Sequence, residues 1–150
     1  MAVWQSFLKA HAGVAVALNK ELEEEREMPV GWYSVLLNLS QAPDGKMRMQ
    51  ELAESVLLSF SGMTRLLDRM EAAGLVKRRA CSEDRRGIFA VITPEGRDAF
   101  KNAAPVHIRG IQEHFARHLT DDEVSVLESA LGKIVAASAP GSPHGCDDAE

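Results

Sequence analysis

The sequence predicts a mainly α-helical fold with one small β-hairpin. Along most of the chain apolar residues recur every three or four positions, which is the periodicity of amphipathic helices. Residues 75–93 break this pattern and are typical of two short strands around an arginine-rich turn. Two short helical stripes directly precede them. The order helix, helix and basic hairpin indicates a winged helix-turn-helix, in which the second helix can enter the major groove of DNA.

Two helices are predicted before the motif. The first covers residues 2–25, where one apolar stripe runs along the helix. It ends at Met28-Pro-Val-Gly31, because proline and glycine interrupt the pattern. The second covers about residues 31–41 and is followed by a turn at Ala42-Pro-Asp-Gly45.

The helices of the motif follow this turn. Met49, Leu52 and Val56 give the first helix its stripe, and the small Ala53 on the same face lets another helix approach closely. Ser59 is a suitable N-cap for the second helix, about residues 60–73, and Gly74 suits its C-terminal end. The inner face of the second helix is apolar. Its outer face carries Ser61, Thr64, Arg65 and Asp68.

After the hairpin, Thr93-Pro94 predicts the start of a helix that reaches about His118. Pro105 is expected to kink or split this helix. The capping box from Thr120 to Glu123 predicts the start of the last helix.

These elements predict one domain over residues 1–138, with the winged helix-turn-helix at about 46–93. The tail 139–150 is rich in Pro, Gly, Ser and Asp and is expected to be disordered. The helices at about 2–25 and 94–138 are longer than a small winged domain needs. A two-fold partner is the simplest cover for their apolar stripes, so we expect these helices to form a homodimer interface.

Charge is distributed unevenly along the chain. The net charge is −5, but residues 46–86 hold nine Lys and Arg against six Asp and Glu. The motif is therefore locally positive, which suits a surface that meets phosphates. No apolar run is long enough to span a membrane, and the N-terminus lacks the pattern of a signal peptide, so a cytoplasmic location is expected. Cys81 and Cys146 fit neither a disulfide framework nor a zinc spacing.

A set of motifs gives the chain a family resemblance. It comprises Glu51-Leu-Ala53, the run from Ser61 to Val76, Asp84-Arg-Arg86 at the hairpin tip, and Ile92-Thr93 with Gly96 three residues on. With these motifs the chain resembles the MarR family of winged-helix transcriptional regulators over roughly residues 2–138.

The resemblance implies an obligate homodimer that binds double-stranded DNA. Each helix 60–73 would enter a major groove, Arg86 would enter the adjacent minor groove, and Arg85 would contact phosphate. Asp84 beside them makes sense as the group that orients an arginine. Ser61 and Thr64 can donate or accept hydrogen bonds, and Arg65 can pair with guanine or phosphate. The expected DNA-binding residues are Ser59, Ser61, Thr64, Arg65, Arg69, Arg85 and Arg86.

The resemblance also implies regulation by a small molecule. Family members usually repress neighbouring genes and release DNA when a small, often phenolic, effector binds between the dimer helices and the DNA-reading motif. His11, Trp32 and Tyr33 are candidate contacts, because aromatic faces with a polar edge suit phenolic ligands. We expect a repressor that binds a short pseudo-palindromic duplex. Phe60 departs from this picture, since a polar DNA contact would be useful near the start of the recognition helix.

Other interpretations stay open at this point. His114 and His118 have a spacing that can hold a metal, and cations near Cys81 favour a reactive thiolate, but we expect no metal, no cofactor and a bystander cysteine. The outer helix face could be merely solvated. The chain could instead be a protein-interaction module or a ligand-binding protein without DNA activity. No enzyme signature is present in the sequence.

Overall fold

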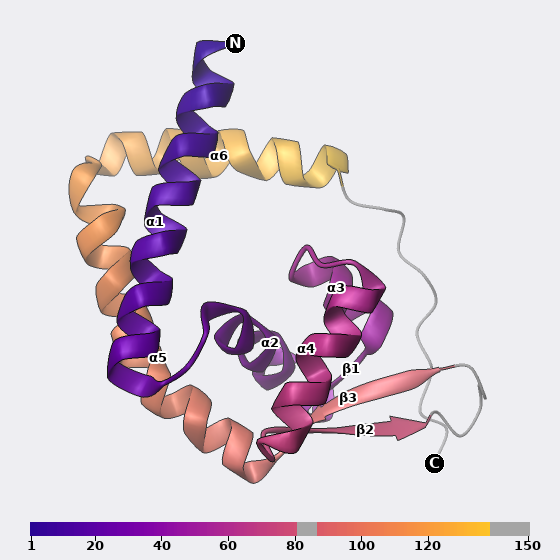
Figure 1. Ribbon diagram of the computed structural model, residues 1–150. Coiled ribbons are helices and arrows are strands. Elements are labelled where there is room, and N and C mark those ends of the chain that lie inside the picture. The colour runs from indigo at the N-terminus through magenta and orange to yellow at the C-terminus, as the bar shows by residue number, and fades with distance from the viewer. Residues whose placement is uncertain (81–86, 139–150) are drawn as a thin grey trace.

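The structure is a computed structural model that describes residues 1–80 and 87–138 (Figure 1). The predicted tail 139–150 lies outside the described residues. Among those described, no helix combines the length and apolar character needed to cross a membrane. The elements are α1 (Ala2–Arg26), α2 (Val30–Gln41), η1 (Pro43–Gly45), β1 (Lys46–Arg48), α3 (Met49–Ser55), α4 (Phe60–Ala72), β2 (Val76–Ala80), β3 (Ile88–Ile92), α5 (Pro94–His114), η2 (Ala116–His118) and α6 (Asp121–Ser138).

The helices α2, α3 and α4 pack against one another and against the small sheet. Burying each large aliphatic side chain there contributes about 1.5–3 kcal/mol. Ala53 is buried among them, as its small size predicted. This core therefore fixes α4 relative to the sheet. The fully buried side chains at its centre include Val35, Leu36, Leu39, Leu52, Met63, Leu67 and Met70.

The helix α4, predicted at about residues 60–73, begins at Phe60 and ends at Ala72. Its buried residues Met63, Leu67 and Met70 follow helical spacing. At its start, the Ser59 hydroxyl accepts a hydrogen bond from the Gly62 N–H at 3.1 Å. At its end, Gly74 has a φ of 76°, which glycine adopts without steric cost.

The sheet has one strand more than the sequence predicted. Both strands of the expected hairpin are present, and β2 pairs antiparallel with β3 from Val76↔Ile92 to Ala80↔Ile88. On its other side, β3 pairs with β1, so the strand order is β1-β3-β2. The third strand, β1, has only three residues, which is too short for an alternating pattern to stand out.

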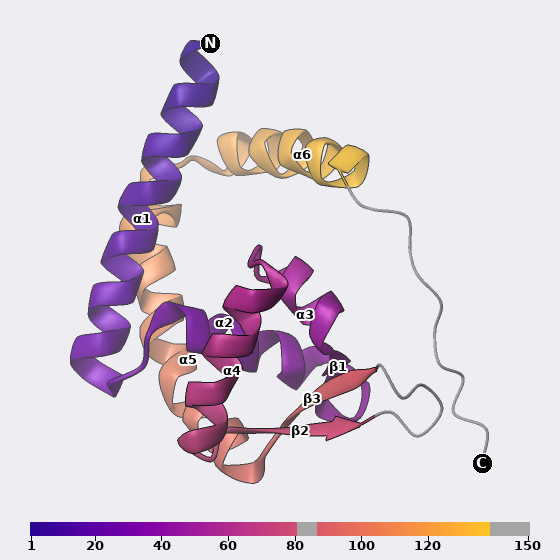
Figure 2. The same cartoon turned by 45° about the vertical axis from the view of Figure 1, so that its right-hand side comes forward.

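The long helices α1 and α5 lie side by side (Figures 1 and 2). A side chain at Gly110 would lie 2.5 Å from the Leu18 side chain, so this glycine allows the close approach of the two helices. Pro105 lies inside α5, so the expectation that it could split the helix is wrong. Figure 1 shows α5 curving along its length without ending. The buried Ala103 and Val106 hold the helix against the core on both sides of the proline.

The last helix, α6, begins at the predicted capping box. The Thr120 N–H donates to the Glu123 carboxylate at 2.8 Å, and the Glu123 N–H donates to the Thr120 hydroxyl at 3.4 Å. Hydrogen bonds from the Thr120 N–H and hydroxyl lower the pKa of the Glu123 carboxyl. None of the residues of α6 is buried within the chain. Its exposed apolar side chains include Val124, Val126, Ile134 and Val135.

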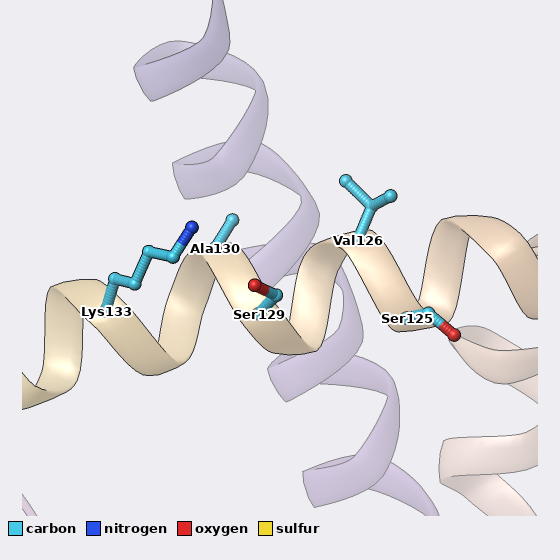
Figure 3. Close-up of a pocket in the computed structure, with 5 residues that line it drawn as sticks. All are labelled: Ser125, Val126, Ser129, Ala130 and Lys133. Atoms are coloured by element: carbon cyan, nitrogen blue, oxygen red, sulfur yellow. The ribbon is translucent and has the colours of Figure 1, made fainter.

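The exposed surface of α6 contains a hollow lined by both apolar and polar side chains (Figure 3). It has a volume of about 330 Å³. In Figure 3, Val126, Ala130 and Lys133 project from one side of α6. Ser125 and Ser129 complete the lining. The surface of α6 thus has a shallow, partly apolar hollow. Among the described residues, only side chains of α6 itself line it.

Leu57 provides a test of backbone strain in the turn between α3 and α4. Its φ is 57°, in the left-handed region, and its side chain is 91% exposed. The left-handed conformation costs a residue with a Cβ about 1–2 kcal/mol, and glycine avoids this cost. Leu57→Gly should therefore raise the free energy of unfolding, measured by urea denaturation, by about 1 kcal/mol. Leu58→Gly is the control and should lower stability, because Leu58 has no positive φ. A less stable Leu57→Gly variant would contradict the assigned backbone.

Candidate nucleic-acid interface

Four of the seven residues that the sequence predicted for DNA contact lie on α4. Ser61, Arg65 and Arg69 are exposed, and Thr64 is half-buried. Neither Arg65 nor Arg69 forms an ion pair with any residue in 1–80 or 87–138. Both guanidinium groups therefore face solvent from one side of a helix whose opposite side is fixed in the core.

The hydroxyl groups of this helix are partly engaged in its own structure. The Ser59 hydroxyl caps the helix and lies 3.2 Å from the Ser61 hydroxyl. The Thr64 hydroxyl donates to the Phe60 carbonyl at 2.9 Å. Ser59 thus serves the start of the helix, and Ser61 is the hydroxyl that is exposed beside the arginines.

Arg78 on β2 binds the side of α4. Its guanidinium donates to the Asp68 carboxylate at 2.6 Å, to the Glu71 carboxylate at 3.1 Å and to the Thr64 carbonyl at 2.9 Å. The Arg78 N–H also donates to Glu71, at 3.0 Å. These bonds join the wing to the helix and neutralise two carboxylates that would repel phosphate. The sequence analysis missed this role; the available signal was a pair of acids spaced three apart on α4, before a basic strand.

Thr93 joins the end of α4 to the start of α5. It is 4% exposed, and its hydroxyl donates to the Gly74 carbonyl at 2.7 Å and accepts from the Gly96 N–H at 3.0 Å. The Thr93 N–H donates to the Leu75 carbonyl at 3.1 Å. A Cβ at Gly96 would lie 2.1 Å from the Leu75 carbonyl oxygen, so this position requires glycine. The spacing of Thr93 and Gly96 is therefore explained by packing.

The wing strands add further basic groups. Lys77 and Arg79 are exposed on β2. Lys46 and Arg48 on β1 lie over the Phe89 ring, 5.9 and 5.5 Å from its centroid, where cations are attracted to the π-face. Figure 2 shows the three strands beside α3 and α4. Of the residues predicted at the wing tip, Asp84, Arg85 and Arg86 lie outside the described residues, as do Cys81 and Cys146.

The candidate effector residues do not form one cluster within the described chain. Tyr33 is buried, and its ring centroid lies 4.2 Å from that of His107 and 5.4 Å from that of Phe100 on α5. Burial raises the pKa of the Tyr33 hydroxyl and lowers the pKa of the His107 imidazole. Trp32 is half-buried, and its buried Nε1–H has no partner among the described residues. By contrast, His11 is exposed on α1, stacked with Phe7.

His114 and His118, which have a metal-binding spacing in the sequence, lie in different surroundings. His114 Nε2 lies 2.6 Å from the Glu21 carboxylate and joins α5 to α1. His118 is exposed in η2. Within residues 1–80 and 87–138, no three His, Cys, Asp or Glu side chains are grouped closely enough to hold a metal.

The helix α4, with its exposed basic residues, packs on α2 and α3 and is followed by the antiparallel strands of the wing. This arrangement defines the chain as a winged helix-turn-helix protein. A sequence model of the MarR family matches residues 27–87. The crystal structure of AbsC, a MarR family transcriptional regulator from Streptomyces coelicolor, is 32% identical, covers 91% of both chains and superposes with a TM-score of 0.83. The chain therefore belongs to the MarR family, as its motifs predicted.

Two further relatives extend the comparison. Sco3205, a MarR family transcriptional regulator from Streptomyces coelicolor solved in complex with DNA, is 28% identical, covers 93% of this chain and 91% of its own, and has a TM-score of 0.85. The transcriptional repressor YetL of Bacillus subtilis is 29% identical over 112 residues, which are 73% of this chain and 65% of YetL. The chain spans 59% to 65% of the length of such curated relatives.

Removing the Arg78 side chain tests the bridge between wing and helix. Arg78→Met should lower the free energy of unfolding by about 1–2 kcal/mol, because Asp68 and Glu71 lose their partner. Arg79→Met is the matched control and should change stability by less than about 0.5 kcal/mol, since Arg79 is exposed. Urea denaturation measures both. Equal losses in the two variants would contradict a bridging role for Arg78.

The His107 stack predicts a pH dependence of stability. Its pKa is lowered in the folded state, so the unfolded state, with a pKa of about 6.5, binds the proton more readily. Stability is therefore complete above that value and should fall as the pH drops from about 7 through the folded pKa. Thermal melting between pH 7.5 and about 5 should show a flatter profile for His107→Gln than for the native chain. His118→Gln, at an exposed site, should keep the native profile; a flattened profile in this control would contradict the assignment to His107.

Proposed function

We propose that this protein is a sequence-specific transcriptional regulator that binds double-stranded DNA with α4 in the major groove. The observation that carries the proposal is the outer face of α4. It presents Arg65 and Arg69 without ion-pair partners among the described residues, while Arg78 neutralises the acids beside them. A helix of this kind fits the major groove, and its arginines can pair with guanine or phosphate.

The DNA complex of Sco3205 supports this proposal. That protein shares 28% of its residues with this chain, and the similarity extends over 93% of it. The winged helix-turn-helix lies inside the matched range, so the same surface is available for the same class of ligand.

The proposed DNA-binding unit is a homodimer. Trp4 near the start of α1 is 59% exposed, and apolar side chains of α6 are likewise uncovered. Figure 2 shows α6 at the opposite end of the molecule from the strands β2 and β3. A two-fold partner would cover both surfaces and place two copies of α4 about 34 Å apart, one helical turn of DNA. The exposed apolar side chains of these helices include Val3, Trp4, Phe7, Leu8, Val126, Ile134 and Val135.

The wing completes the proposed contact. Arg86, oriented by Asp84, would enter the minor groove, and Arg85 would bind phosphate; all three lie outside the described residues. A planar guanidinium suits the narrow and electronegative minor groove. The exposed Lys77 and Arg79 on the described part of the wing support a basic surface that continues toward this groove.

Repression released by a small molecule is the proposed mode of action. The similarity to YetL, a transcriptional repressor, supports repression. For the effector, we propose a small aromatic or phenolic compound that contacts Trp32, Tyr33 and His11. The Nε1–H of Trp32, which has no hydrogen-bond partner in the described part of the chain, could donate to a phenolic oxygen. The partner subunit would have to help enclose the compound, since His11 is exposed on α1.

A gel-shift titration on the DNA upstream of the protein's own gene tests the proposal. Binding should weaken steeply with salt, because Lys and Arg displace counterions from phosphate. Arg65→Ala and Arg86→Ala should each weaken binding about 10- to 100-fold, which corresponds to the loss of one paired contact of about 1–3 kcal/mol. Lys101→Ala removes an exposed charge on α5 and should bind like the native protein.

A random-sequence selection covers the case of an operator located elsewhere. Failure to enrich any duplex would contradict the proposal and favour a protein-interaction module or a ligand-binding protein. Native affinity in Arg86→Ala would remove the wing tip from the mechanism while leaving α4 in place.

A further inference from the structure

An aromatic side chain lies exposed in the first turn of α4. Phe60 is the first residue of the helix, directly after the Ser59 cap, and is 57% exposed. Large aromatic side chains are more often buried, and a ring that stays exposed at this point is available to contact a ligand. Met63 and Leu67 follow Phe60 on the same stripe of the helix and are fully buried, so the core ends before the first turn and leaves the Phe60 ring outside it.

The hydroxyls nearby take part in bonds of the helix itself. The Thr64 hydroxyl donates to the Phe60 carbonyl, and the Ser59 hydroxyl accepts from the Gly62 N–H and lies 3.2 Å from the Ser61 hydroxyl. Phe60 and Thr64 are four residues apart and so lie on the same side of the helix. On this side of the first turn the Thr64 hydroxyl proton is thus used within the helix, and the exposed group is the Phe60 ring.

We propose that Phe60 is a specificity-determining residue that packs against the C5-methyl group of a thymine. This inference rests on the proposed function. Recognition helices contact base edges with their N-terminal residues, which is where Phe60 lies. Thymine alone among the four bases presents a methyl group in the major groove, and phenylalanine is one of the side chains that contact it.

The position of the ring relative to the charges favours DNA over an apolar protein partner. Phe60 is adjacent to the exposed Ser61 and lies five residues before Arg65, whose guanidinium has no ion-pair partner in residues 1–80 and 87–138. A duplex that meets Arg65 therefore also meets the first turn. An apolar protein surface would have to desolvate that guanidinium without pairing it, which is costly. The ring thus supplies an apolar contact inside a positive surface.

Uracil substitution isolates this contact, because uracil differs from thymine only by the missing methyl group. In a duplex obtained by selection with the native protein, each thymine is replaced by uracil in turn, and affinity is measured by fluorescence anisotropy. At one symmetry-related position, the native protein should lose about fourfold in affinity per half-site, the effect of leaving one methyl group unburied. Phe60→Ala should bind the thymine and uracil duplexes equally, and Phe60→Leu should keep part of the difference.

Leu57→Ala is the matched control, because it removes an exposed apolar side chain from the turn just before α4. It should keep the native difference between thymine and uracil. Thermal melting confirms that the variants are folded, as expected for an exposed position.

Three results would overturn the inference, and each is distinct. Tight binding without any thymine-to-uracil effect would reject the methyl contact while leaving the proposed function intact. A Phe60→Ala variant that keeps the native affinity and the native difference would assign the ring to a protein partner instead. Failure of the native protein to bind any selected duplex would reject the proposed function together with the inference.

Discussion

The hydrogen bonds of Thr93 are the constraint on which the arrangement of this molecule depends. This buried hydroxyl bonds to the carbonyl of Gly74, where α4 ends, and to the N–H of Gly96, where α5 begins. A buried hydroxyl without partners would cost free energy, so both bonds are needed together. They place the helix that faces outward at a fixed angle to the helix that packs on α1. Gly96 completes the junction, because a larger residue would collide with the Leu75 carbonyl.

Arg78 fixes the same helix from the side of the sheet. The junction at Thr93 holds the end of α4, whereas Arg78 reaches the carbonyl of Thr64 near its middle. A single guanidinium thus orients the wing and changes the charge of the helix surface by pairing with Asp68 and Glu71. The positive surface of α4 comes from this pairing as much as from the arginines on α4, and it arises in a chain whose net charge is −5.

Elements whose signals are local could be predicted from the sequence. The helices α4 and α6 each carry their own cap and stripe, and the family resemblance pointed to the outer face of α4, whose contact with DNA stays a prediction. Features set by tertiary contacts could not. Strand β1 exists because Met47 pairs with Ala90 far along the chain. Arg78 looks like a phosphate contact until the register of β2 places it beside Glu71, and Pro105 looks like a break until packing holds α5 together.

The exposure of α6 has a thermodynamic consequence. This helix has 18 residues and buries none of them in its own chain. Most of the stability of a helix in a protein comes from packing its amphipathic face, and even a complete capping box adds only about 1 kcal/mol. Its helical state therefore depends on contact with another surface, and folding and association form one equilibrium for this segment. Under mass action, the helix content of α6 would follow the concentration of the chain, while the motif around α4, which has its own core, would not.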